Sequence, residues 1–203
     1  MSVKRRRPTP SRDTPRLRRR DVVRRLLADR GDLLVVAGLG AAAWDVAAAG
    51  DHPLSFPLWG AMGGAAMVGL GLALAQPKRR VLVVTGDGEM LMGLGSLATI
   101  AVQRPRNLVV VVLDNERYGE TGMQPTHTAC GVDLAGVAKA AGFARVMRVT
   151  TTAGVTRLVA TVHAGRGPVF AQIKVLAESP PLVLPPRDGV LLKTRFRAAL
   201  GHP

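Results

Sequence analysis

The stretch VVTGDGEMLMGLG, residues 83–95, decides the fold because a strand pattern and a helix pattern meet within it. The apolar residues 80–85 predict a buried strand that ends at Gly86-Asp87-Gly88. A helical pattern follows over residues 90–102, with Pro105 beyond its end. Glycines on both sides of an aspartate allow the backbone to turn sharply and to approach a ligand closely. The stretch therefore predicts a strand, a polar turn and a helix in succession, with ligand chemistry at the turn.

A second stretch, NLVVVVLDN at residues 107–115, has the same form and ends in Asp114 and Asn115. Its unbroken apolar run is typical of a strand buried on both faces. The periodicity predicts further strands at 33–37, 143–149 and 167–176 and helices at 21–30, 41–50, 62–75, 133–142 and 152–164, with a loop at 51–57. This alternation predicts an α/β fold of three layers, a mostly parallel sheet with helices on both faces. Ligands of such sheets bind at the carboxyl ends of the strands.

The formal net charge of +14 is concentrated at the N-terminus rather than spread over the chain. Residues 1–20 contain nine Lys and Arg, one Asp and three Pro, a composition that predicts a disordered basic tail. We expect one domain over residues 21–176 and a proline-rich, basic C-terminal extension over 177–203. No apolar segment follows the arginines, so the tail lacks the form of a secretory signal. A tail that contacts RNA, an acidic partner or a membrane surface and one that only aids solubility both stay open.

The single cysteine, Cys130, excludes an internal disulfide and a metal site built from cysteines. It is compatible with a reducing compartment, and we expect a cytoplasmic location. The segment 57–75 carries no charge over 19 residues, which is close to the length of a membrane-spanning helix. Its many glycines, Pro57 at its start and the strand that follows favour a buried helix instead. We therefore expect no membrane association.

The two polar strand ends can together bind a diphosphate through a cation. Gly88 precedes the predicted helix, whose free N–H groups and positive dipole end favour a phosphate group. Asp87 would repel a diphosphate unless a divalent cation lies between them, and Mg²⁺ prefers hard oxygen ligands of this kind. Asn115 and the backbone carbonyls after it offer further oxygens. GDG alone is common in ordinary loops, but the 26 residues between Gly88 and Asn115 fit one crossover helix and the neighbouring strand.

Other phosphate-binding motifs are missing, since the sequence has no GxGxxG after its first strand and no GxxxxGKS or GxxxxGKT. Instead, GDGEMLMGLGSLATI at 86–100 and VVLDNERYGETGMQPT at 111–126 resemble the diphosphate-binding half of thiamine diphosphate enzymes, in which GDG precedes an Asn at such a spacing. Within that family the resemblance is greatest to sulfopyruvate and phosphonopyruvate decarboxylases, and it covers roughly residues 30–175. It implies the thiamine diphosphate-binding fold, with thiamine diphosphate and Mg²⁺ as cofactors.

The resemblance implies roles for the matching residues of the two motifs. Asp87 and Asn115 would ligate Mg²⁺, with the backbone carbonyl of Arg117 as the third protein ligand. The side chain of Glu89, beside the diphosphate, is expected to point away or to cap the helix. Backbone contacts with the diphosphate are implied for the turn itself, at Gly86, Gly88 and Glu89.

The resemblance also implies contacts with the two rings of the cofactor. Met62 would lie under the thiazolium ring, and Gly60 would hold the aminopyrimidine through its carbonyl group. By periodicity alone Met62 would be assigned to the core. His127 and His52 lie in predicted loops near the expected cofactor, and they are weak candidates for proton transfer or for binding a substrate anion.

The function implied is that of a thiamine diphosphate-dependent carboxy-lyase acting on a small 2-oxoacid. In the family, the glutamate that activates the cofactor comes from a second domain of similar size. We expect a separate pyrimidine-binding subunit to supply it, in a heterotetramer or larger assembly, and we expect this chain to be inactive alone. An acyl-transferring or oxidising enzyme subunit is the alternative within the class. A non-catalytic basic protein that binds RNA or a protein partner is the alternative outside it, although the charge distribution leads us to expect no nucleic-acid binding.

Overall fold

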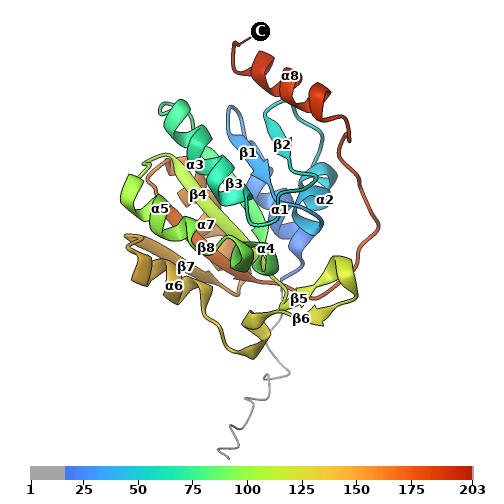
Figure 1. Ribbon diagram of the computed structural model, residues 1–203, viewed down its shortest axis with the longest axis vertical. Coiled ribbons are helices and arrows are strands. Elements are labelled where there is room, and N and C mark those ends of the chain that lie inside the picture. Colours follow the sequence, from blue (N-terminus) through green and yellow to red (C-terminus); the bar gives the residue numbers. More distant parts are fainter. Residues whose placement is uncertain (1–16, 203) are drawn as a thin grey trace, which may run out of the picture.

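A six-stranded sheet forms the centre of the protein, as a computed structural model of residues 17–202 shows (Figure 1). The strand order is β2-β1-β3-β4-β8-β7, and every neighbouring pair is parallel. The strands are β1 (Leu34–Ala37), β2 (Ser55–Pro57), β3 (Val81–Gly86), β4 (Leu108–Asp114), β7 (Arg145–Val149) and β8 (Val169–Lys174). A short antiparallel pair, β5 (Arg117–Tyr118) and β6 (Gln124–Pro125), lies in the loop after β4.

Helices cover both faces of this sheet, so the three-layer α/β prediction is confirmed. One face packs against α1 (Arg19–Leu27), α2 (Ala41–Ala48) and α7 (Thr152–Ala164). The other packs against α3 (Ala65–Ala75), α4 (Asp87–Met92), α5 (Ser96–Gln103), α6 (Leu134–Ala141) and α8 (Gly189–Ala199). Successive residues of a strand point to opposite faces, and in β3 Leu82 and Val84 enter one core while Val81 and Val83 enter the other. Burial on both sides explains why β3 and β4 are continuously apolar.

Two elements differ from the sequence-based expectation in the segments around the site. Residues 51–57, predicted as loop from their prolines, include β2. This strand lies at the edge of the sheet and pairs only with β1, where a proline such as Pro57 is tolerated. The helix predicted over 90–102 is two helices, α4 and α5. The break lies near Gly93, whose backbone closely contacts Gly63 in the loop before α3. A Cβ at Gly93 would lie only 2.1 Å from the carbonyl oxygen of Gly63.

The prediction that the basic tail extends to residue 20 is wrong for its last residues. Leu17 already forms a β-bridge with Val175, and α1 begins at Arg19. Arg19 belongs to the helix because it is buried in an ion pair with Asp45 of α2, a contact that sequence patterns do not reveal. Residues 1–16, which make up the rest of the predicted tail, lie outside the described residues.

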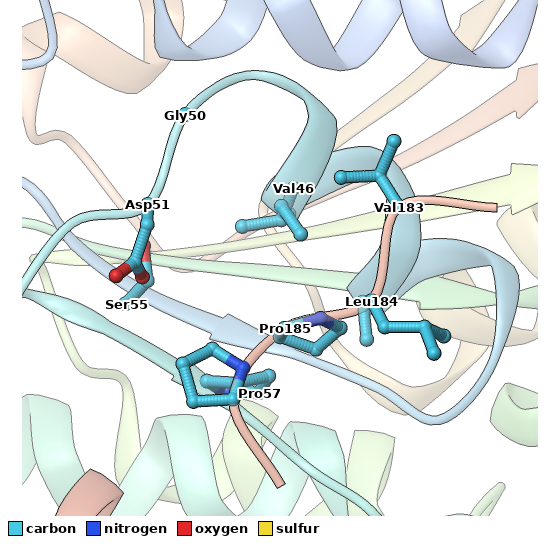
Figure 2. Close-up of a pocket in the computed structure, with 11 residues that line it drawn as sticks. Val46, Gly50, Asp51, Ser55, Pro57, Val183, Leu184 and Pro185 are labelled. Atoms are coloured by element: carbon cyan, nitrogen blue, oxygen red, sulfur yellow. The ribbon is translucent and has the colours of Figure 1, made fainter.

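The segment after β8 packs against the β2 edge of the sheet. Figure 2 shows Val183, Leu184 and Pro185 facing Val46 of α2 and Pro57 of β2 around a pocket. Further along, the indole Nε1 of Trp59 donates a hydrogen bond of 2.7 Å to the carbonyl oxygen of Pro186, and the segment then forms α8. Phe196 of α8 packs against Phe56 of β2, with ring centroids 5.4 Å apart. Residues 177–202 are therefore an ordered covering for an otherwise open sheet edge.

The uncharged segment 57–75 contains only one helix, α3, which is 11 residues long. Within residues 17–202, no helix combines the length and the apolar character that crossing a membrane requires.

Candidate functional site

Asp87 lies at the carboxyl end of β3, where the strand passes directly into α4 (Figure 1). Its side chain is only 1% exposed. The carboxylate oxygen Oδ2 accepts hydrogen bonds from two threonine hydroxyls in the loop after β6, at 2.5 Å from Thr126 and 2.9 Å from Thr128. This buried position follows from the Gly86-Asp87-Gly88 turn, which directs the chain back under the loop.

No basic side chain of residues 17–202 forms an ion pair with Asp87. Burial raises the pKa of this carboxyl group, and the nearby carboxylate of Asp114 raises it further, while the hydrogen bonds from Thr126 and Thr128 act in the opposite direction. Burying a carboxylate without a cationic partner is unfavourable. The position is therefore suited to a cation that is not a side chain.

Asp114, at the end of the neighbouring strand β4, is completely buried but is well provided with donors. Its Oδ2 accepts hydrogen bonds from Gln172 at 2.6 Å and lies 2.7 Å from the ammonium of Lys174, both on β8. Its Oδ1 lies 2.8 Å from the hydroxyl oxygen of Thr128. Burial lowers the pKa of Lys174, but its bonds to Asp114 and Glu116 outweigh that effect and leave the pKa raised. A polar network therefore crosses three adjacent strand ends.

Asn115 follows β4 directly, at the same end of the sheet as Asp87, since Gly86 and Leu113 are paired in the register. Its side-chain oxygen accepts a hydrogen bond of 2.9 Å from the backbone N–H of Arg117, which forms a tight turn. The intervening Glu116 has a φ of +65°, an uncommon conformation for a residue other than glycine. The turn places an amide and several backbone carbonyl groups beside the strand end.

The donor set is chemically narrow. Within residues 17–202, no three His, Cys, Asp or Glu side chains are arranged to hold a metal ion. The oxygen donors that the sequence predicts are one carboxylate at Asp87, one amide at Asn115 and the backbone at Arg117, all at the carboxyl end of the sheet. This set fits a hard cation such as Mg²⁺ that completes its coordination with phosphate and water oxygens.

Gly88 is required by packing in the first turn of α4. A side chain at this position would place its Cβ 2.4 Å from a ring carbon of Tyr118 in β5. The Tyr118 ring can therefore lie directly on the backbone of the turn only because residue 88 is glycine. The contact fixes the β5–β6 pair against the start of α4.

Glu89 is buried, and its side chain lies between the start of α4 and the end of β1. The hydroxyl of Thr85 donates a hydrogen bond of 2.5 Å to its Oε2, and a Cβ at Gly38 would lie only 1.8 Å from the same oxygen. Burial raises the pKa of Glu89, and the hydrogen bond from Thr85 together with the backbone amides of Leu39, Gly63 and Gly86 lowers it by a smaller amount. The contact with the backbone amide of Gly86, the N-cap of α4, matches the helix-capping orientation, one of the two expected for this side chain.

The loop that contains Gly60 and Met62 lies beside α4. Gly63 has a φ of +86°, and a Cβ there would lie 2.8 Å from the backbone nitrogen of Gly93, so the two backbones are in contact. Gly60 is exposed, and the side chain of Met62 is 46% exposed. Met62 is therefore not a core residue, contrary to what its periodicity alone indicates.

The two candidate histidines lie in different parts of the molecule. His127 begins a short 3-10 helix (His127–Cys130), between the threonines that contact Asp87, and is exposed. His52 precedes β2, and its Nδ1 accepts a hydrogen bond of 3.1 Å from the backbone N–H of Leu54. Because β2 runs parallel to β1, residues before it lie at the amino end of the sheet, opposite to Asp87. The expectation that His52 lies near the site is therefore wrong, and its cause is the unrecognised strand β2.

Several members of the polar network were missed by sequence reasoning. Asp114 is adjacent to Asn115, and the polar residues at the end of the apolar strand β8 were a usable signal, because polar groups at strand ends converge in a parallel sheet. No comparable signal marks the two threonines, which lie in a loop. The missed residues are Asp114, Thr126, Thr128, Gln172 and Lys174.

The fold and the oxygen donors at the carboxyl ends of parallel strands have the form expected of a domain that binds a diphosphate through a cation. The family described as thiamine pyrophosphate enzyme, C-terminal TPP binding domain, matches residues 38–173, and the chain belongs to this family. The resemblance inferred from the motifs is confirmed.

Curated relatives extend this result. The chain is 41% identical over 159 residues to sulfopyruvate decarboxylase subunit beta of Methanothermobacter thermautotrophicus, covering 78% of this chain and 82% of that subunit. It is 41% identical over 167 residues to phosphonopyruvate decarboxylase of Streptomyces viridochromogenes, covering 82% of this chain but 42% of that protein. A solved structure from Mycobacterium smegmatis, described as a thiamin diphosphate-dependent enzyme, shares the fold with a TM-score of 0.68 at 23% identity, over 81% of this chain and 33% of that one.

Proposed function

We propose that this chain is the thiamine diphosphate- and Mg²⁺-binding subunit of a 2-oxoacid decarboxylase. The observation that carries the proposal is the buried carboxylate of Asp87. It has no basic partner among residues 17–202, and it lies at the carboxyl end of β3, beside the end of β4 that Asn115 follows. A cation held there offsets the unpaired charge and bridges to a diphosphate. The names of the curated relatives support decarboxylation as the reaction.

Each site residue has a distinct task in this proposal. Asp87, the amide oxygen of Asn115 and the backbone carbonyl of Arg117 hold Mg²⁺. Gly60 and Met62 orient the two rings of the cofactor from the neighbouring loop. The cofactor, when bound, supplies the electron sink for loss of CO₂ from a 2-oxoacid. The backbone N–H groups available to the diphosphate belong to the turn, at Gly86, Gly88 and Glu89.

A separate pyrimidine-binding subunit completes the active site in this proposal. A relative named as a beta subunit is matched over 82% of its length, whereas a decarboxylase named without a subunit is matched over 42% of a longer chain. The same domain thus occurs in both arrangements. Around the cofactor loop, the apolar side chains of Met62 and Met92 are 46% and 57% exposed, as expected for a surface that another subunit covers.

The substrate class in this proposal is a small 2-oxoacid with a second anionic group, after the sulfopyruvate and phosphonopyruvate of the relatives' names. We keep the cytoplasm as the proposed location. The exposed free thiol of Cys130 is compatible with a reducing compartment.

The test is co-purification of the chain with a candidate pyrimidine-binding subunit, followed by measurement of CO₂ release from sulfopyruvate, phosphonopyruvate and pyruvate. We expect turnover only when both subunits, thiamine diphosphate and Mg²⁺ are present, and loss of turnover in Asp87→Ala. Full activity of the isolated chain would contradict the shared active site. Binding of thiamine diphosphate and Mg²⁺ without any decarboxylation by the complex would leave the cofactor assignment intact and overturn the reaction assignment.

A further inference from the structure

Two threonine hydroxyls lie between the carboxylates of Asp87 and Asp114. The Oγ1 of Thr128 is 2.9 Å from Asp87 Oδ2, 2.8 Å from Asp114 Oδ1 and 2.9 Å from the Oγ1 of Thr126. The Oγ1 of Thr126 is 2.5 Å from Asp87 Oδ2. Both threonines are buried, so water does not replace these contacts freely.

The number of protons limits how these contacts are made. A hydroxyl group carries one proton, so Thr128 cannot donate to both carboxylates at once. Asp114 already receives hydrogen bonds from Gln172, from Lys174 and from the backbone N–H of Glu116. Asp87 receives no side-chain hydrogen bond within residues 17–202 other than those of the two threonines. The need for the proton of Thr128 is therefore greater at Asp87.

These hydrogen bonds involve only one of the two carboxylate oxygens of Asp87. With Oδ2 held by the two hydroxyls, the plane of the carboxylate is determined. The second oxygen, Oδ1, receives no side-chain hydrogen bond among the described residues. Gln172 and Lys174 hold Asp114 in place from β8, and the Asp114 carboxylate lies 2.8 Å from the hydroxyl oxygen of Thr128.

We propose that Thr126 and Thr128 are positioning residues for the cation, because their hydroxyl groups hold Oδ2 of Asp87 and thereby present Oδ1 to the metal ion. The inference rests on the proposed function, since it requires a cation at Asp87. Groups that orient a metal ligand without touching the metal commonly control metal affinity. Neither threonine contacts the substrate or the cofactor in this role.

The test is titration of the full chain with Mn²⁺ in the presence of saturating thiamine diphosphate, with free Mn²⁺ measured by electron paramagnetic resonance. We expect Thr128→Val and Thr126→Val each to weaken Mn²⁺ binding by about 10- to 100-fold. Thr128→Ser keeps the hydroxyl group and should restore binding. Thr161→Val is the matched control, because it removes a buried hydroxyl group on α7 that donates to the carbonyl oxygen of Arg157 and accepts from Arg145, and it should leave the affinity unchanged.

Asp87→Asn separates failure of this inference from failure of the proposed function. If Asp87→Asn abolishes Mn²⁺ binding while both valine variants bind as the wild type does, the positioning role is overturned and the cation site stands. If Asp87→Asn binds Mn²⁺ normally, the proposed cation site itself is wrong. A structural role alone predicts an equal drop in melting temperature for Thr128→Val with and without Mn²⁺, and this result would also overturn the inference. If Thr128→Val does not fold, Thr126→Val decides, since the hydroxyl group of Thr126 contacts only Asp87 and Thr128 among residues 17–202.

Discussion

Asp45 and Asp87 are two carboxylates that are equally removed from water, at 0% and 1% exposure, but their surroundings differ. Asp45, on α2, lies 3.3 Å from Nη1 of Arg19 and 3.1 Å from Nε of Arg20, at the start of α1. Asp87, at the end of β3, has two threonine hydroxyls and no basic partner among the described residues. A buried acid that is paired with arginines belongs to the fold. Asp87 lacks such a partner and lies beside a second polar strand end, and this combination indicates a site.

The pKa shifts show the same contrast. Burial raises the pKa of both carboxyl groups. At Asp45 the two arginines oppose the effect of burial, although Glu178 adds to it, whereas at Asp87 the charge effect comes from another carboxylate, Asp114, which adds to burial. Burial is the largest influence on both groups, but only Asp45 has cationic side chains that oppose it, and a cation at Asp87 would act in the same direction.

The largest effect expected from this comparison is on stability at Asp45. Replacing Asp45 with Ala leaves the guanidinium of Arg19, which is only 4% exposed, buried without a carboxylate. We expect the free energy of unfolding to fall by about 3–5 kcal/mol, with Mn²⁺ affinity of the folded fraction unchanged. Urea denaturation at pH 7 measures the change.

Asp133→Ala is the matched control for that experiment. Asp133 also pairs with an arginine, Arg148, but both side chains are more than half exposed. Removing an exposed ion pair changes stability by about 0–1 kcal/mol. A cost at Asp45 no larger than that at Asp133 would show that burial of the Arg19 pair does not matter and would remove one side of the comparison.

The next effect is at Asp87 and concerns ligand-linked stability. In Asp87→Asn the amide oxygen can still accept from Thr126 and Thr128, so we expect the free energy of unfolding without ligands to change by about 1 kcal/mol or less. Wild-type protein should gain about 2.7 kcal/mol when Mg²⁺ and thiamine diphosphate are present at 100 times their dissociation constant, and the variant should gain nothing. Urea denaturation with and without both ligands gives the two differences. Equal stabilisation of both proteins would place the cation elsewhere.

Much of this site could be predicted because it depends on local sequence. The strands β3 and β4 are apolar up to their last one or two residues, so the polar groups that follow, at Asp87 and Asn115, were located from the pattern alone, and their adjacency follows from the rules for parallel sheets. The hydrogen bonds that hold Asp87 could not be predicted in this way. They span 39 and 41 residues and depend on how the loop after β4 folds back, which no local periodicity encodes.

The errors have a common physical origin in contacts distant in the sequence. The prolines of 51–57 indicate a loop locally, but an edge strand needs hydrogen bonds on one side only, so β2 forms and moves His52 to the far end of the sheet. In the same way, α1 extends back to Arg19 because a residue of α2 pairs with it. Both cases show tertiary contacts overriding local propensity, as does the break between α4 and α5 where Gly63 crosses Gly93.

A smaller effect is expected at Lys174, whose partly exposed ammonium group neutralises the buried carboxylate of Asp114. Its side chain is 38% exposed, and Asp114 keeps its hydrogen bonds from Gln172 and from the backbone N–H of Glu116 when the ammonium is removed. For Lys174→Met we expect a loss of about 1 kcal/mol in the free energy of unfolding, after allowance for solvent screening. Chemical denaturation at low and at 1 M salt tests this expectation. A loss as large as that in Asp45→Ala would mean that Asp114, too, depends on its cation for folding.

The smallest effect is expected at Asp51, whose carboxylate pairs with Arg195 of α8 at the surface. The hydrogen bond from Arg195 lowers the pKa of Asp51 more than partial burial raises it. A lowered pKa in the folded state means that the ion pair contributes stability above the ordinary Asp pKa, near 3.9, and loses it as the pH falls through the lowered value. With 58% of the Asp51 side chain exposed, the contribution should be about 0–1 kcal/mol at pH 7. The free energy of unfolding of Asp51→Asn should therefore differ slightly from that of the wild type at pH 7, and the two should be equal once the pH is below the lowered pKa of Asp51. Urea denaturation at a series of pH values from 7 downward measures the difference. A difference that grows as the pH falls would contradict the sign of this shift, because it would mean that the protonated carboxyl group stabilises the position of α8.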